Sequence, residues 1–295
     1  MKSYKLRMRK TLLCAIAFAL GATAAYSQAY VSVSGGYGFQ AHTKVLGRDA
    51  SNPTNISELK GSYGEGYQAQ LRGGYFFHKR WGGELALGYL HGEDMPTNKN
   101  KMLDMKGHGR AFGASLSVVF NVTDNLYLRA GGVTKIGGKT EVNTQLNATL
   151  PLQLFNPLAP AGSTVNMKAD LQNSFHGKIP FGFIGGIGYR FKVTDNINFF
   201  VEGEYLNINV PRKESKLKSF EASRSTGGAS QALSVEEFKA YMAKVQNSGT
   251  APAALKQLAG QLSPLLEDSY NWEGKGAPDA PYSSIGFHFG VTYKF

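Results

Sequence analysis

A strict alternation of apolar residues with small or polar ones is the feature that most constrains the fold of this chain. Near the C-terminus it runs from Tyr282 to Phe295, and its apolar positions are Ile285, Phe287, Phe289, Val291, Tyr293 and Phe295. The residues between them are glycine, histidine, threonine and lysine. Successive side chains of a β-strand point to opposite faces of the sheet. The pattern therefore predicts a strand with one apolar face and one small or polar face.

The same alternation returns along the chain and predicts eight strands. They span about residues 29–39, 65–77, 81–91, 107–120, 126–136, 178–191, 197–209 and 282–295. Each has about 11–14 residues, and a tilted strand needs roughly 9–11 residues to cross a bilayer. After the N-terminal segment no stretch is apolar for ~18 residues, which excludes membrane-spanning helices.

The connections between the predicted strands alternate between tight turns and long loops. The tight turns lie at residues 78–80, 121–125 and 192–196, and the long loops at about 40–64, 92–106, 137–177 and 210–281. Two turns are near copies, because Phe120–Leu126 and Phe191–Ile197 share the run Val-Thr-Asp-Asn. Asp and Asn tolerate the left-handed backbone of a short hairpin turn. This rhythm indicates antiparallel hairpins with the short turns at one end of the sheet and the long loops at the other.

The two faces of the strands decide between a soluble barrel and a membrane barrel. A soluble barrel hides its large side chains inside and carries charge outside. Here the face opposite the apolar one is rich in glycine and serine, as in Gly182, Gly186, Gly188, Ser115 and Ser117. Such a face suits the narrow interior of an eight-stranded barrel. The prediction is an all-β fold, an eight-stranded antiparallel transmembrane barrel whose apolar face meets lipid.

The N-terminal segment predicts export. Five basic residues and no acidic ones precede an apolar run from about Leu12 to Ala25, and small residues flank a cleavage site near Ser27. The run of about 14 residues is shorter than the roughly 20 that span a bilayer as a helix. Loss of residues 1–27 leaves 27 of the 32 basic residues against 21 acidic ones, so the formal charge falls from +11 to +6. It also removes the single cysteine, Cys14, and with it any disulfide framework.

The signal segment, the eight strands, the loop rhythm and the terminal Gly290-Val-Thr-Tyr-Lys-Phe295 resemble the small outer-membrane β-barrel family. That family includes the outer-membrane protein A transmembrane domain and the W-type barrels. The resemblance covers about residues 28–295, and it implies an outer-membrane location with periplasmic short turns and extracellular long loops. It also implies a C-terminal signal for the barrel assembly machinery, formed by Val291, Tyr293 and Phe295.

Strand parity places several charged residues inside the predicted barrel. The deeper ones are Arg72, Glu84, Arg129, Glu202, Glu204 and His288. Arg190 and Lys294 lie one residue from the short turns, at what we expect to be a wet periplasmic rim. Buried charges must be paired, so we expect a network that closes the lumen. The alternative is a narrow or gated conduit lined by these charges.

The last long loop, 210–281, predicts a short helical insert. Ser234-Val-Glu-Glu237 has the form of a capping box, and Phe238, Met242 and Val245 follow on one face. A second run places Leu255, Leu258, Leu262 and Leu265 at helical spacing. We expect a helical hairpin that packs on itself or caps the barrel mouth, serving either to shield the barrel end or to recognise a partner.

The favoured function is that of an integral outer-membrane barrel with a structural, adhesive or surface-interaction role. The alternative is a narrow channel for small hydrophobic or ionic solutes, and a lipid-modifying enzyme is a further candidate. The sequence shows no triad around its loop-end histidines and Ser174, and no metal-ligand cluster, so we expect no enzyme, metal or cofactor. The expected partners are membrane lipid, lipopolysaccharide and the assembly machinery, with a possible extracellular partner on the long loops. The charge favours lipopolysaccharide over nucleic acid.

Overall fold

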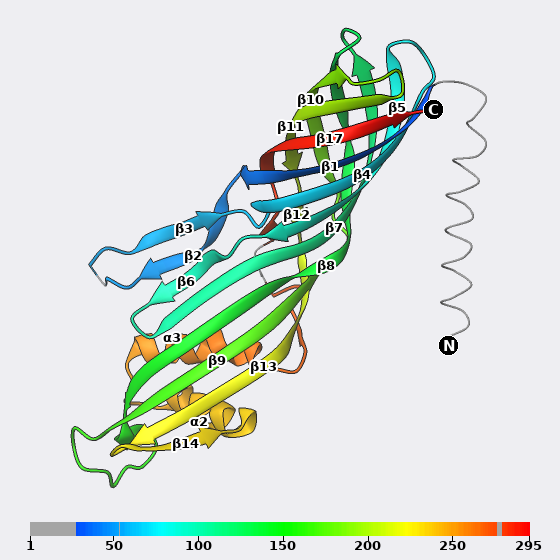
Figure 1. Ribbon diagram of the computed structural model, residues 1–295. Helices are drawn as coiled ribbons and strands as arrows, with labels where there is room; N and C mark the ends of the chain where they lie inside the picture. Colours follow the sequence, from blue (N-terminus) through cyan, green and yellow to red (C-terminus); the bar gives the residue numbers. More distant parts are fainter. Residues whose placement is uncertain (1–27, 53, 276–278) are drawn as a thin grey trace, which may run out of the picture.

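The computed structural model describes residues 28–52, 54–275 and 279–295, and its centre is a closed β-barrel (Figure 1). The predicted signal peptide, residues 1–27, lies outside the described residues. Within these residues eight antiparallel strands close the barrel, with β17 paired to β1 at the seam. In chain order they are β1 (Ala29–Gln40), β4 (Gly66–Phe76), β5 (Trp81–Gly92), β7 (Leu103–Asn121), β8 (Leu126–Pro151), β10 (Gly182–Lys192), β11 (Ile197–Asn207) and β17 (Ser284–Lys294). The predicted fold class and all eight strands are confirmed.

The outer surface of the barrel is apolar and exposed, and its interior is lined by small and polar side chains. Leu116 is 69% exposed and Tyr67 is 64% exposed, whereas Ser115 and Ser117 on the opposite face are buried. Gly36 shows why small residues line the interior, since a Cβ there would overlap the carbonyl oxygen of Phe287. A continuous band of exposed apolar side chains is the surface that a lipid-facing barrel presents.

Two barrel strands run far beyond the barrel and past the ends predicted for them at about residues 107 and 136. β8 continues to Pro151 instead of ending near residue 136, and β7 begins at Leu103. The alternation in β8 continues through buried Val142, Leu146 and Leu150. The same strand therefore contacts lipid along the barrel and covers a second hydrophobic core beyond the barrel. β9 (Thr164–Gly177), β13 (Arg212–Thr226) and β14 (Ala229–Leu233) extend this sheet.

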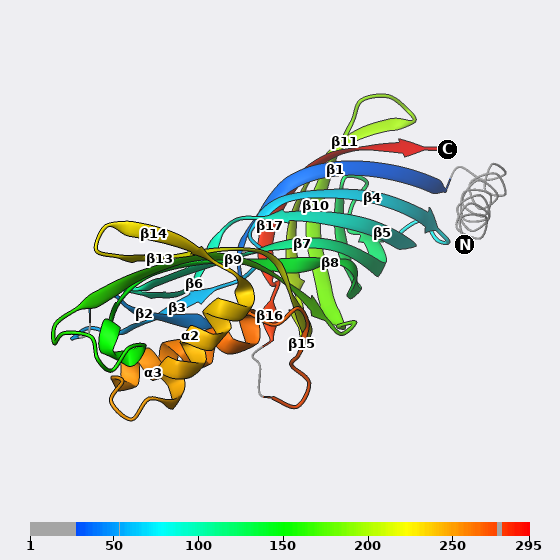
Figure 2. The ribbon, with the colours of Figure 1, turned by 90° about the horizontal axis from the view of Figure 1, so that it is seen from below.

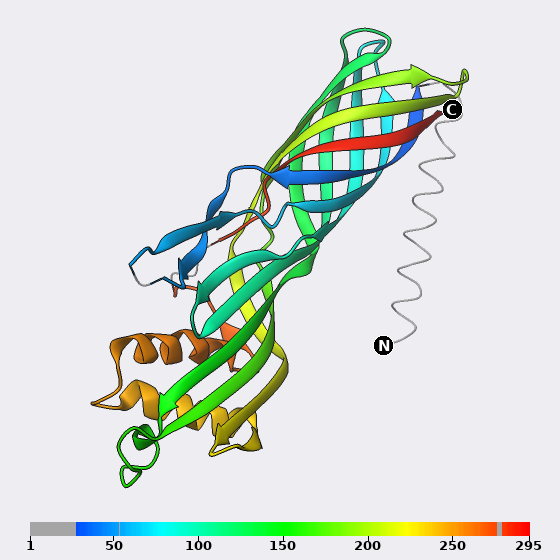
Figure 3. The same cartoon turned by 60° about the vertical axis from the view of Figure 1, so that its left-hand side comes forward.

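Two helices cover one face of the extended sheet. α2 (Val235–Asn247) and α3 (Ala253–Leu262) lie beside β9 and β13, well away from the barrel (Figures 1 and 2). Figure 3 shows the barrel at one end of the molecule and the helices at the other. We call residues 137–177 and 212–272 the sheet–helix module. The predicted helical insert is therefore present, but it packs on the sheet and does not cap the barrel mouth.

The core of the sheet–helix module explains this position. Phe238 and Leu262 are fully buried between the helices and the sheet, and Met167 of β9 is buried against them. The predicted capping box is formed, with Glu237 N donating to Ser234 Oγ at 3.3 Å and Ser234 N donating to Glu237 Oε2 at 2.8 Å. The apolar face of the helices packs against the inward side chains of β8 and β9. The barrel mouth does not supply these side chains.

The remaining elements are short. β2 (Lys44–Ala50), β3 (Ser57–Gly61) and β6 (Met95–Asn100) form an arm beside β7. The others are β12 (Asn209–Val210), β15 (Tyr270–Asn271), β16 (Ala280–Pro281) and the single 3₁₀ turns η1 (Leu152–Leu154) and η2 (Ser263–Leu265). None of the helices in residues 28–52, 54–275 and 279–295 is long and apolar enough to cross a membrane.

Candidate functional site in the barrel interior

The six deeper charges predicted for the lumen all lie inside the barrel and are buried. They come from five strands, and the buried side chains are Arg72 of β4, Glu84 of β5, Arg129 of β8, Glu202 and Glu204 of β11, and His288 of β17. Parity was sufficient to place them inside, because each strand alternates strictly between lumen and lipid.

Glu202 is the centre of the network and is completely buried. Arg72 binds its carboxylate through two hydrogen bonds, Nη1 to Oε2 at 2.9 Å and Nη2 to Oε1 at 2.8 Å. Arg129 Nη2 donates to Oε1 at 2.9 Å, and Tyr127 Oη donates to Oε2 at 2.7 Å. The carboxylate of Glu202 therefore binds three other side chains of the barrel interior, and two of these side chains are cationic.

The other two carboxylates complete the network. Glu204 accepts a hydrogen bond from Arg129 Nη2 and two from Gln70 Nε2, at 3.0 and 3.1 Å. Glu84 accepts from Tyr30 Oη at 2.8 Å and lies 3.5 Å from Arg129 Nη1. Three carboxylates and two guanidinium groups thus meet in the middle of the lumen. Such bidentate and charge-assisted bonds are strong and directional, which fixes the side chains across the interior.

Three participants were not among the charged residues singled out from the sequence. Tyr30, Gln70 and Tyr127 share the inward parity of the charges, and each donates to one of the three glutamates. They are neutral, so a search for charge alone passes over them. They could have been predicted from inward parity combined with a hydroxyl or amide group at the end of the side chain.

Arg190 differs from its predicted setting at a wet rim, and His288 lies in the lumen without a hydrogen bond to the network. His288 lies 3.6 Å from Glu204 through Nε2, too far for a hydrogen bond. Arg190 is buried, not solvated: its guanidinium stacks 3.9 Å from the ring of Tyr127 and donates to Asn121 Oδ1 at 2.8 Å. The prediction of a wet rim is wrong for Arg190, because an inward tyrosine covers it. Lys294 is only partly buried.

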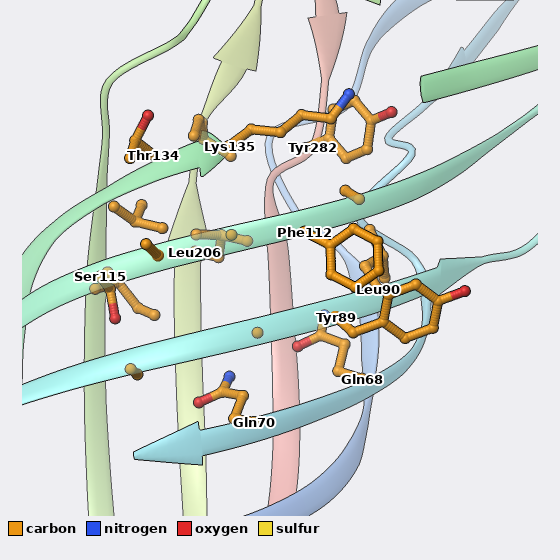
Figure 4. A pocket seen from close by; sticks show the side chains of 18 of the residues that line it. Gln68, Gln70, Tyr89, Leu90, Phe112, Ser115, Thr134, Lys135, Leu206 and Tyr282 are labelled. Atoms are coloured by element: carbon orange, nitrogen blue, oxygen red, sulfur yellow. The ribbon is translucent and has the colours of Figure 1, made fainter. Parts of the chain in front are cut away.

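The loop end of the barrel interior is filled by an apolar cluster. Its buried members include Tyr63, Leu90, Ile208, Val210 and Tyr282. The chain that carries Tyr63 crosses to the segment before β17, where Tyr63 N donates to the carbonyl of Pro281 at 2.8 Å. Between this cluster and the ion-pair network lies a cavity of about 90 Å³, whose lining side chains are shown in Figure 4.

The loop-end histidine and serine candidates do not come together as a catalytic pair. His108 is hydrogen-bonded to acids, with Nδ1 2.7 Å from Asp94 Oδ1 and Nε2 3.3 Å from Glu141 Oε2. Ser174 Oγ and His176 Nδ1 are buried without hydrogen-bond partners among the described residues. Among residues 28–52, 54–275 and 279–295, no group of three or more His, Cys, Asp or Glu residues could hold a metal ion.

A closed barrel with an apolar outer belt and a paired polar interior defines a transmembrane β-barrel protein. The family model for the outer membrane protein beta-barrel domain matches residues 11–223, and the chain belongs to this family. It is accordingly a protein of the outer membrane.

Three solved structures illustrate what the chain is similar to. Ail, the attachment invasion locus protein of Yersinia pestis, is 12% identical, with 91% of this chain and 99% of that one covered and a TM-score of 0.32. CarO of Acinetobacter baumannii is 13% identical, with 91% and 97% covered and a TM-score of 0.31. The outer membrane protein AlkL is 9% identical, with 92% of each chain covered and a TM-score of 0.32. A comparison with curated proteins gave no match.

Proposed function

We propose that this protein is a structural or surface-interaction barrel whose lumen is closed and whose sheet–helix module is held outside the cell. The observation that supports a closed lumen is the contact of Arg72 and Arg129 with Glu202 across the interior. Their guanidinium nitrogens lie 2.8–2.9 Å from its carboxylate oxygens. An eight-stranded barrel is just wide enough for its own side chains. A solute that separated the paired charges at its centre would leave each charge buried without a partner, which costs free energy.

The sheet–helix module supplies the surface for interaction. Its sheet has one face under the helices and one face free, and the free face carries polar side chains in cross-strand rows. One such row consists of the exposed residues Gln145, Asp170 and Glu221 on β8, β9 and β13. A rigid, polar face far from the barrel suits contact with other molecules at the cell surface, including an extracellular partner.

The other partners follow from the membrane setting. Lipopolysaccharide would surround the loop end of an outer-membrane barrel, and the excess of basic residues favours such anionic neighbours. Val291 and Tyr293 lie outward on β17, and Phe295 follows directly after it, so all three are exposed where the assembly machinery could reach them. We assign the protein no catalytic role.

The second candidate function is passage of small hydrophobic or ionic solutes. The cavity above the ion-pair network favours it, because part of the path is already open. Conduction would require the network to part, and the two functions therefore differ in whether the protein carries current.

The outward orientation of the module is tested by epitope insertion. A short tag after Leu158, which is 93% exposed at the tip of the β8–β9 hairpin, is expected to bind antibody on intact cells. The same tag after Asp124, in a short turn, is the matched control and should bind only after the outer membrane is permeabilised. Staining of the Asp124 tag on intact cells, with no staining at Leu158, would reverse the proposed orientation.

A further inference from the structure

Lys135 is set apart from the other interior charges by its surroundings. It lies on β8 and lines the cavity between the ion-pair network and the apolar cluster (Figure 4). Arg72 and Arg129 are each bound to carboxylates. Lys135 makes no ion pair with any residue that the structure describes, and its Nζ lies 5.0 Å from the ring centre of Tyr282. A partly buried ammonium with only a ring face as partner keeps most of its capacity to bind an anion.

The walls of the cavity are mostly apolar. Leu90, Ile184, Leu206 and Ile208 contribute aliphatic side chains, and the ring of Tyr282 lies beside Lys135. The polar groups at the other end are already engaged, since Gln70 and Glu204 are bound to each other at 3.0 and 3.1 Å. A ligand that fits would therefore have one anionic end and an aliphatic remainder.

The size of the cavity limits the ligand further. Its volume of about 90 Å³ is well below the roughly 300–1,000 Å³ of pockets that hold drug-sized molecules. A dianion is disfavoured because Lys135 is the single cation among the lining residues and Glu204 adds a negative charge at the far end.

We propose that this cavity binds a small aliphatic monocarboxylate, with the carboxylate on Lys135 Nζ and the chain between β5, β10 and β11. Binding here needs no passage through the ion-pair network, so the site is compatible with a closed lumen. The same chemistry is offered by free short-chain acids and by fatty acids of the membrane, and chain length separates these sources.

The test uses the full mature chain refolded in uncharged detergent, with isotope-labelled hexanoate as the probe and nuclear magnetic resonance as the readout. Hexanoate is expected to bind the unaltered protein, and Lys135→Met should weaken binding by about tenfold or more, as for loss of a hydrogen bond to a charged group. Lys139→Gln is the matched control, because Lys139 lies on the same strand but pairs with Glu141 at 2.7 Å and does not line the cavity. It should leave hexanoate binding unchanged.

A variant that fills the cavity and two other ligands test the cavity and the carboxylate separately. Ala86→Leu fills the cavity without changing the charge and should abolish hexanoate binding. Hexan-1-ol and dodecanoate should both bind more weakly than hexanoate. The proposal is overturned if hexanoate does not bind the unaltered protein or binds Lys135→Met equally well. It is also overturned if chloride competes as well as hexanoate, or if dodecanoate binds as tightly. A heat-dependent gel shift of each variant shows whether its barrel has folded.

Discussion

Replacement of Glu202 by alanine is expected to lower the free energy of unfolding of the barrel by about 3–5 kcal/mol, the cost of breaking a buried ion pair from one side. Glu202 is completely buried and accepts hydrogen bonds from Arg72, Arg129 and Tyr127. Without its carboxylate, Arg72 loses both of its short ion-pair contacts and keeps a 3.7 Å approach to Glu204. Two guanidinium groups would then share two carboxylates inside the barrel.

The measurement is equilibrium urea unfolding of the refolded protein in lipid vesicles, followed by tryptophan fluorescence. Glu58→Ala is the matched control, since Glu58 pairs with Lys60 at 3.3 Å but both side chains are more than half exposed. An exposed pair contributes about 0–1 kcal/mol, so this variant should unfold almost as the unaltered protein does. The double variant Arg72→Met/Glu202→Leu should recover part of the loss, because it removes charge from both sides. Equal stabilities for Glu202→Ala and Glu58→Ala would show that the network does not hold the barrel together.

Phe238→Ala is expected to remove about 3–5 kcal/mol from the stability of the sheet–helix module while leaving the barrel folded. Phe238 is a fully buried residue of α2, and its ring centre lies 5.5 Å from that of Phe220 on β13. Truncation would leave a cavity at the contact between helix and sheet. The core of the module contains no residue of the barrel interior, so the damage should stay local.

Limited proteolysis of the vesicle-embedded protein checks this expectation. Phe238→Ala should be cut within 212–272 at protease concentrations that spare the unaltered protein, and its heat-dependent gel shift should persist. Glu236→Ala, on the exposed face of the same helix, is the control and should resist cleavage. If the barrel lost its gel shift together with the module, the two would form one cooperative unit and the local account would be wrong.

The barrel strands and their two faces could be predicted from the sequence because both are local properties. Period-two alternation determines which face each residue occupies, and the tight turns limit which strands are neighbours. The same parity placed Arg72, Glu84 and Glu202 in the lumen. It could not say which side chains meet there, because that depends on the stagger between strands as far apart in sequence as β4 and β11.

The regions outside the barrel were harder to predict. The helical spacing of Leu255 and Leu258 and the capping box at Ser234 were local signals, and both helices are present. Their packing surface lies on β8 and β9, whose alternation above the membrane resembles that within it. Tyr63 and Tyr282 meet from segments more than 200 residues apart with no periodicity to mark them. The closure at the loop end of the interior was therefore not predictable.

The ion-pair network is proposed to close the lumen, and single-channel recording in planar bilayers tests this closure most directly. The refolded protein, shown to be inserted by its gel shift and by protection of the barrel from protease, is expected to give no discrete openings. A general-diffusion porin in the same bilayer serves as the positive control for recording. Discrete openings of the unaltered protein that change in conductance when Glu202 or Arg129 is replaced would contradict the account and assign the lumen to conduction.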